Sequence, residues 1–283
     1  MHSLSILVAV AGAPDGEDAI AVAADLAYRH ASTAVVVNLF APVPMVAAAP
    51  GFAGGVMSPQ VWQALEERED AIKIKVAALV GHESERFGLG GDAGRMIVAL
   101  PRETPWASLT YELPLVDLVV AAQSSVTGEG PWNGALSQAL MEARAPVYIA
   151  RDMVSAAGRP AAVAWDGGFE AARAVRAALP LLRDASEVAI LQDPEGLDTS
   201  DGARADPRRL MEFLSLHGVA TQTVLEAHGR KIGPALLAAA KTFNAALLVS
   251  GAFRHSRLEE AIFGGATRAL LAEADGPHLL IAH

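Results

Sequence analysis

Three glycines near the end of the chain stand where backbone groups could hold a phosphate. Gly251 follows the uncharged run 246–250, which is typical of a buried strand, and Gly264 and Gly265 come directly before the helical pattern of residues 266–274. Glycines let backbone N–H groups approach phosphate oxygens, and the start of a helix adds a favourable partial positive charge. The stretch therefore predicts a phosphate-binding loop, although its glycines could equally be turn residues.

Polar side chains in and around this loop could add to the binding of an anion. Arg254 and His255 could supply positive charge, and Thr267 could supply a hydroxyl. Asp166 follows the predicted strand of residues 161–165, where its carboxylate could accept a hydrogen bond from a base or a ribose. The residues alone favour a different role for Asp166, as the N-cap of the next helix.

Other kinds of chemistry have little support in the sequence. The chain has no cysteine, which excludes disulfides, thiolate zinc sites and cysteine nucleophiles. The histidines are scattered, and His217, His228 and His255 share no i,i+4 helical spacing with another ligand, so no metal site is expected. Ser256 lies beside His255 but lacks the strand–turn–helix context of a hydrolase nucleophile.

Composition and charge narrow the class of protein. The formal net charge of -10 argues against a general nucleic-acid binder, which needs a basic face. Residues 1–153 carry a net charge of -8 and residues 154–283 a net charge of -2, so the second part is the easier host for a phosphate ligand. A long uncharged stretch that includes residues 34–63 is broken by prolines and glycines, and no signal peptide is visible at the start. We therefore expect a cytoplasmic protein that does not cross a membrane.

Short apolar runs alternate with helical patterns along the chain, as in a parallel sheet with right-handed crossovers. In the first part, strands are expected at residues 4–10, 34–40, 95–100, 115–122 and 146–151, and helices at residues 15–30, from Ser58 and Pro59 through Leu79, and at residues 104–113 and 132–143. The order then restarts, with strands at residues 161–165, 188–191, 219–225, 246–250 and 278–282, helices at residues 169–182, 207–216, 232–242 and 266–274, and a polar loop at residues 193–206.

The repeated order of elements predicts two tandem domains, residues 1–153 and residues 154–283, with a linker at residues 152–159. Each domain is expected to be a doubly wound, five-stranded parallel sheet with strand order 3-2-1-4-5. In such a sheet, ligands bind at the carboxyl ends of the strands where the order reverses, here between the first and the fourth strand. That position brings Asp166 and Gly251 together in the second domain.

The second domain resembles the universal stress protein family over residues 160–283. The resemblance lies in the opening segment Ala162–Val175, the fourth strand and loop Leu247–Arg257, and the closing segments Phe263–Arg268 and Pro277–Ala282. In residues 1–151 it depends on the order of elements and on Pro146–Ala150. The resemblance implies an adenine nucleotide alpha hydrolase-like fold for both domains.

Nucleotide-binding members of this family have a loop of Gly, two residues, Gly, nine residues, Gly, and then Ser, Thr or Asn. Gly251 and Gly264 match the first and third glycines, whereas Arg254 stands at the second glycine and Gly265 at the hydroxyl or amide position. Asp166 matches the aspartate that the family places near the adenosine. The resemblance thus implies a nucleotide-binding set of Ala164, Trp165, Asp166, Gly251, Arg254, His255, Gly264, Gly265 and Thr267.

The first domain departs further from this motif. Gly12 falls where Asp166 sits in the second domain, so the carboxylate is missing. Residues 121–125, with the sequence Ala-Ala-Gln-Ser-Ser, replace the glycine that starts the loop. We interpret the first domain as a degenerate copy that keeps the fold without the site.

The resulting hypothesis is a cytoplasmic stress-response protein whose second domain binds ATP, ADP or AMP, with magnesium present only in association with the nucleotide. No residue is placed to position a hydrolytic water, so we expect no enzymatic role. The alternative is an interaction module in which Arg254 and Gly265 have closed the site; an enzyme that uses another nucleotide lacks a catalytic pair. The two domains are expected to pack as a pseudo-dimer through their last strands, residues 147–151 and 279–283, and a homodimer is also compatible with the sequence.

Overall fold

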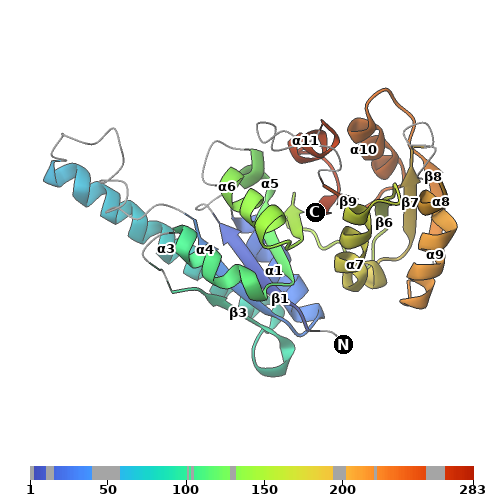
Figure 1. Ribbon diagram of the computed structural model, residues 1–283. Coiled ribbons are helices and arrows are strands. Elements are labelled where there is room, and N and C mark those ends of the chain that lie inside the picture. The colour runs from blue at the N-terminus through green and yellow to red at the C-terminus, as the bar shows by residue number, and fades with distance from the viewer. Residues whose placement is uncertain are drawn as a thin grey trace. The chain divides into compact units, whose positions relative to one another are not determined.

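The computed structural model describes residues 3–10, 16–39, 58–100, 102, 105–127, 132–193, 202–219, 222–252 and 265–283. These residues belong to two compact units, Met1–Ala135 and Leu136–His283. Figure 1 shows that each unit consists of a sheet covered by helices, which confirms the predicted α/β class.

The first unit contains a parallel sheet with its strands in the order β3-β2-β1-β4. Ile6 is aligned with Ala34 on one side and with Leu118 on the other. Runs of Ile, Leu, Val and Ala suit strands that helices cover on both faces, and all residues of β4 are buried. The strands are β1 (Ser5–Val10), β2 (Thr33–Asn38), β3 (Arg95–Val98) and β4 (Leu118–Ala122).

The longest helix of this unit, α3 (Pro59–Phe87), begins where the sequence predicts. Ser58 Oγ accepts a hydrogen bond from Val61 N at 3.3 Å, and Pro59 occupies the first turn. The helix continues beyond its predicted end at Leu79 and stops at Gly88, whose φ of 62° gives a left-handed C-cap. The first turns of α3 project beyond the sheet (Figure 1). The other helical segments are α1 (Glu17–Arg29), η1 (Gly91–Ala93), α4 (Pro105–Glu112), η2 (Leu113–Leu115) and α5 (Gln123–Thr127).

The second unit contains a sheet with its strands in the order β5-β10-β9-β6-β7-β8. If β6 is counted as the first strand of the second repeat, the order β8-β7-β6-β9-β10 is the predicted order 3-2-1-4-5. All pairings among these strands are parallel. The order reverses between β6 and β9, as the sequence predicts. The strands are β5 (Val147–Ala150), β6 (Ala161–Ala164), β7 (Val188–Gln192), β8 (Gln222–Glu226), β9 (Leu247–Gly251) and β10 (His278–Ala282).

Small side chains let the helices of this unit approach the sheet and each other closely. The helix α7 packs on β9 and β10, and its buried face includes Ala171, Ala174 and Ala178. At the contact between α10 and α11, a Cβ on Gly233 would lie 2.8 Å from the Cβ of Ala269. The helices are α7 (Phe169–Asp184), α8 (Gly202–Ala205), α9 (Pro207–Leu216), α10 (Ile232–Thr242) and α11 (Gly265–Ala272).

The strand β5 lies antiparallel to β10, with Leu279 aligned with Ile149 and Ile281 with Val147. The predicted contact between the last strands of the two repeats is therefore confirmed. The pairing satisfies backbone groups that would otherwise be exposed at a sheet edge. The repeat boundary that the sequence predicts, at residue 153, differs from the division of the compact units between Ala135 and Leu136. By sequence β5 thus belongs to the first repeat, and by its contacts it belongs to the second unit.

Arg151, directly after β5, ties this strand to α11 and β10. Its guanidinium donates hydrogen bonds to the carbonyl oxygens of Pro277 and Leu270, both at 2.5 Å. Its backbone N–H donates to Nδ1 of the buried His278 at 3.1 Å, and Nε2 of that imidazole lies 2.8 Å from the carbonyl oxygen of Val154. With Nδ1 accepting and Nε2 donating, the neutral imidazole satisfies both partners.

Burial lowers the pKa of His278 below its ordinary value, against the opposing effect of the Val154 carbonyl and Asp152. The unfolded chain therefore binds a proton at higher pH than the folded chain. As pH falls below about 6.5, the folded state loses stability with a slope of at most about 1.4 kcal/mol per pH unit from this group. We expect the Tm of His278→Gln, measured by calorimetry, to fall less between pH 7 and pH 5 than the Tm of wild type does. Equal pH slopes in the two proteins would contradict this role.

Two helical segments differ from the prediction. The short helix α8 lies inside the expected polar loop of residues 193–206, of which residues 194–201 lie outside the described residues. The helix expected over residues 132–143 is α6 (Trp132–Ser137) followed by a π-helical turn, η3 (Gln138–Glu142). Apolar periodicity does not distinguish an α-turn from a π-turn, which explains the second difference.

Two strands begin later than expected. The strand predicted from Leu115 begins at Leu118, because residues 113–115 form the 3-10 turn η2 and Val116 N donates to the carbonyl oxygen of Leu113. The strand predicted from Val219 begins at Gln222. Here Val219 N instead donates to the carbonyl oxygen of Leu214 and helps to close the end of α9.

Candidate functional site

The parallel pairing of β6 with β9 brings the two predicted halves of the site to one edge of the sheet. Ala161 is aligned with Leu247 and Val163 with Val249, so both strands run to the same carboxyl edge. Ala164 is the last residue of β6 and is buried, and the half-buried Trp165 and Asp166 follow it. Gly251 is the last residue of β9.

Asp166 has a different local role from the one predicted. Its Oδ1 accepts a hydrogen bond from Gly168 N at 2.8 Å, and Gly168 is the N-cap of α7. The prediction that Asp166 is the N-cap is therefore wrong by two positions. Gly167, with a φ of 74°, makes the intervening turn in the left-handed region. The hydrogen bond to Gly168 N fixes the Asp166 carboxylate in the loop between β6 and α7.

Gly251 is a glycine for a structural reason that holds with or without a ligand. A Cβ at this position would lie 2.5 Å from Ala171 N and 2.8 Å from the carbonyl carbon of Glu170. The first turn of α7 thus approaches β9 too closely for any side chain. The presence of a glycine here follows from helix–sheet packing as well as from the loop motif.

At the other end of the loop, α11 begins at Gly265. A Cβ on Gly265 would meet none of the described atoms within 4 Å, so there is free space beside this first residue of the helix. Thr267 is only 4% exposed. The predicted hydrogen bond from its hydroxyl to a phosphate would therefore have to form on the buried side of the first turn of α11. The remaining members of the predicted set, Arg254, His255 and Gly264, lie outside the described residues.

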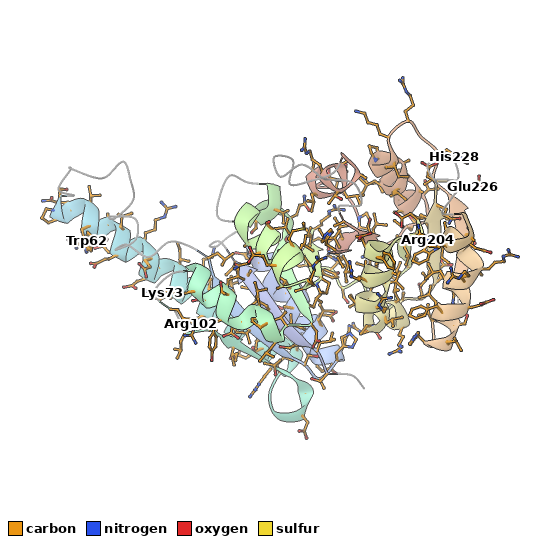
Figure 2. The ribbon with its side chains drawn as sticks, viewed as in Figure 1. Trp62, Lys73, Arg102, Arg204, Glu226 and His228 are labelled. Atoms are coloured by element: carbon orange, nitrogen blue, oxygen red, sulfur yellow. The ribbon has the colours of Figure 1, made fainter. Side chains whose placement is uncertain are left out.

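A cleft of about 450 Å³ adjoins this edge between α7, α8 and α9. Of the predicted residues, the structure places Trp165 in its lining. Apolar side chains form much of the wall, and three arginines line it as well. The apolar residues include Val175, Leu210 and Phe213, and the arginines are Arg176, Arg204 and Arg209, of which Arg204 is labelled in Figure 2.

The loop between β6 and α7 packs directly on α8 at one end of this cleft. A Cβ on Gly167 would lie 2.6 Å from Ala205 N, and Gln192 Nε2 donates a hydrogen bond to the carbonyl oxygen of Ala205. The cleft is therefore supported by contacts among three segments that are separate in the sequence. This cleft is not predicted from the sequence; the alternation of arginines with apolar residues in α9 is the signal that could have indicated it.

A second cleft, of about 420 Å³, lies at the amino-terminal edge of the same sheet. Its lining is mixed in charge and includes Asp152, Arg159, Lys241 and Asp275. Lys241 is already paired with Glu273 at 2.7 Å. Because acidic and basic side chains are mixed, the lining favours neither an anionic nor a cationic ligand. The cleft beside Trp165 is therefore the better candidate for binding.

The described part of the chain contains neither a candidate metal site nor a helix that could span a membrane. No group of three or more His, Asp or Glu side chains among those residues is arranged to hold a metal ion. Of the helices that the structure describes, none is long and apolar enough to cross a membrane.

Comparison with known proteins agrees with the repeated architecture. The model of the universal stress protein family matches residues 4–105 and 159–282. The chain is similar in structure to a universal stress protein from Archaeoglobus fulgidus DSM 4304, with a TM-score of 0.70, 16% identity, and coverage of 99% of this chain and 96% of that chain. It is also similar to a protein from Pseudomonas aeruginosa UCBPP-PA14 assigned to the universal stress proteins, with a TM-score of 0.53, 14% identity, and coverage of 99% and 93%. Among curated proteins, no sequence matches the chain.

The fold and these matches define a protein built from tandem α/β domains of one kind. The chain belongs to the universal stress protein family. This membership supports a role in the response to stress. The structural likenesses, at 14–16% identity, show the fold alone.

Proposed function

We propose that the second domain binds an adenine nucleotide at the carboxyl edge of β6 and β9, and that the protein acts through this binding in a cytoplasmic stress response rather than as an enzyme. The pairing of β6 with β9 carries the proposal, because it brings the Asp166 loop and Gly251 to one edge where the strand order reverses. The free space beside Gly265 would let a phosphate approach the first residue of α11. ATP, ADP and AMP share the groups that this edge would recognise.

Calorimetric titration of the full chain with ATP, ADP and AMP, each with and without magnesium, tests the proposal. We expect heat of binding, together with protection of residues 251–267 from hydrogen exchange. Gly264→Asp would place a carboxylate against the phosphates and should weaken binding at least tenfold, whereas Gly81→Asp on α3 should leave it unchanged. Absence of both heat and protection would exclude the nucleotide.

Restoring a hydroxyl at the start of α11 should strengthen nucleotide binding. Gly265→Ser introduces a side chain into open space, so no steric cost is expected. A hydrogen bond to a charged phosphate contributes about 1.5 kcal/mol, which corresponds to a roughly tenfold decrease in Kd for ATP by calorimetry. The matched control is Gly81→Ser, whose Cβ also meets no atom within 4 Å. An unchanged Kd in Gly265→Ser would place the phosphates away from this helix.

A second candidate function is an interaction module without a nucleotide. Two observations favour it: packing alone explains Gly251, and Thr267 is buried. In this alternative the fold is kept for binding another protein, and the titrations with nucleotides would give no heat.

A further inference from the structure

The indole of Trp165 carries an unsatisfied hydrogen-bond donor inside the second unit. Its Nε1 is buried and has no hydrogen-bond partner among the described residues. An unpaired buried donor costs about 1–3 kcal/mol. The same indole forms part of the wall of the cleft between α7 and α9. A ligand atom that accepts a hydrogen bond from Nε1 would remove this cost on binding.

The wall around the indole suits a flat, apolar ring. Val175 from α7 and Leu210 and Phe213 from α9 form apolar surface in the cleft. Phe169, at the start of α7, also lines it and is 69% exposed, which is unusual for an aromatic side chain of this size. The volume of about 450 Å³ lies within the range of small-molecule sites, which span roughly 300–1,000 Å³.

The charge of the lining favours an anion. Arg176 on α7 and Arg209 on α9 are exposed and line the cleft from its two helices. Among the residues that the structure describes, Arg209 Nη1 donates a long hydrogen bond, of 3.5 Å, to the carbonyl oxygen of Ala203, and the charge of Arg209 also acts on Asp206. No acidic side chain is among the described lining residues, and each of the flanking acidic side chains has a hydrogen-bond or ion-pair partner. Glu170 pairs with Arg173 at 3.8 Å, Asp206 pairs with Arg208 at 2.7 Å, and Asp166 accepts from Gly168 N.

We propose that this cleft binds a planar aromatic anion. The ring lies between the apolar walls, an acceptor on the ring takes the hydrogen bond of Trp165 Nε1, and the anionic group pairs with Arg176 and Arg209. Because Nε1 is not accessible to solvent, the ligand must turn the indole to reach it. The site shares Trp165 with the predicted nucleotide-binding set but uses neither Gly251 nor α11, so it does not depend on the phosphate-binding loop.

Nuclear magnetic resonance of the ¹⁵N-labelled full chain tests the proposal directly, because each tryptophan gives one indole N–H cross-peak. The chain has four tryptophans, and the cross-peak that is absent in Trp165→Phe identifies Trp165. The probe is quinoline-6-carboxylate, which carries a ring acceptor and an anion at opposite ends, and AMP is titrated separately. We expect quinoline-6-carboxylate to move the Trp165 cross-peak in a saturable way, and neutral quinoline to bind more weakly.

Variants of the two arginines test the anionic end. Arg176→Gln and Arg209→Gln should each weaken the binding of quinoline-6-carboxylate by about fivefold at low salt. Arg230→Gln is the matched control, because Arg230 is exposed in the same unit and does not line the cleft. Both arginines are exposed, so these variants are expected to fold.

The outcomes separate the cleft from the nucleotide loop. Quinoline-6-carboxylate binding that persists in Gly264→Asp supports a separate site, even if ATP gives no heat. Binding by AMP alone, lost in Gly264→Asp, would make the cleft part of a nucleotide site and overturn the proposal. Saturation without movement of the Trp165 cross-peak, equal affinity in the arginine variants, or no binding at several millimolar probe would overturn it as well.

Discussion

Replacing Gly251 with alanine is expected to lower the free energy of unfolding of the second unit by about 3 kcal/mol. The added Cβ would lie 2.5 Å from Ala171 N, so either β9 or the first turn of α7 has to move. Both are backbone segments within the packed sheet and cannot yield as the end of a flexible side chain can. Urea denaturation would measure the loss, and hydrogen exchange in α7 and β9 would locate it.

Gly265→Ala is the matched control for this substitution. It adds the same methyl group to the other end of the same loop, where a Cβ meets no atom within 4 Å. Its stability should equal or slightly exceed that of wild type, since alanine favours a helix over glycine. If both variants unfolded at the wild-type urea concentration, the contact between α7 and β9 would not restrict position 251. A loss of nucleotide binding in Gly251→Ala would then have to come from the ligand site itself.

Replacing Arg151 with methionine is expected to destabilise the second unit by about 3 kcal/mol. The variant keeps an apolar side chain of similar length but removes the hydrogen bonds to the carbonyl oxygens of Pro277 and Leu270. Burial lowers the pKa of Arg151 to about 10, with Glu273 opposing this shift, so the guanidinium remains charged at neutral pH. Hydrogen bonds from a charged donor are stronger than those from a neutral donor, and the substitution removes the donor of both carbonyl oxygens at once.

Thermal unfolding followed by calorimetry would measure this effect, with Arg230→Met as the control. Arg230 is exposed in the segment before α10, so its replacement should change Tm very little. Arg151→Lys should fall between wild type and Arg151→Met, because an ammonium group cannot reproduce the planar geometry of a guanidinium. Equal Tm values for Arg151→Met and Arg230→Met would show that the Arg151 contacts contribute no net stability.

The elements of the fold could be predicted where local signals and apolar periodicity agree. The helix α9 has its predicted bounds, Pro207–Leu216, because Asp206 caps it and Pro207 suits its first turn. The helix α10 also has its predicted bounds, Ile232–Thr242. The strand order followed from the repetition of alternating strands and helices together with the handedness of crossovers. The π-turn η3 and the helix α8 have no such local signal.

The candidate site was predictable only in part, because packing between separate segments decides the rest. The sequence placed Asp166 and Gly251 at one edge, and the pairing of β6 with β9 confirms that arrangement. The sequence could not show that the first turn of α7 lies too close to Gly251 for a side chain. Nor could it show that Asp166 accepts a hydrogen bond from Gly168 N instead of occupying the N-cap position. The cleft beside Trp165 depends on how α7 and α9 pack across the loops, which no local pattern records.

The antiparallel pairing of β5 with β10 has a consequence for how the two repeats depend on each other. A fragment comprising residues 154–283 would keep β10 but lose its neighbour β5, which would leave the backbone groups of residues 279–281 along a free edge. A second copy of that fragment could occupy the vacant edge, but only at a rate and extent set by its concentration. In the intact chain the linker at residues 152–159 holds β5 beside β10 at the millimolar effective concentration that a short tether provides. The duplication thus replaces a concentration-dependent association between chains with one that survives dilution.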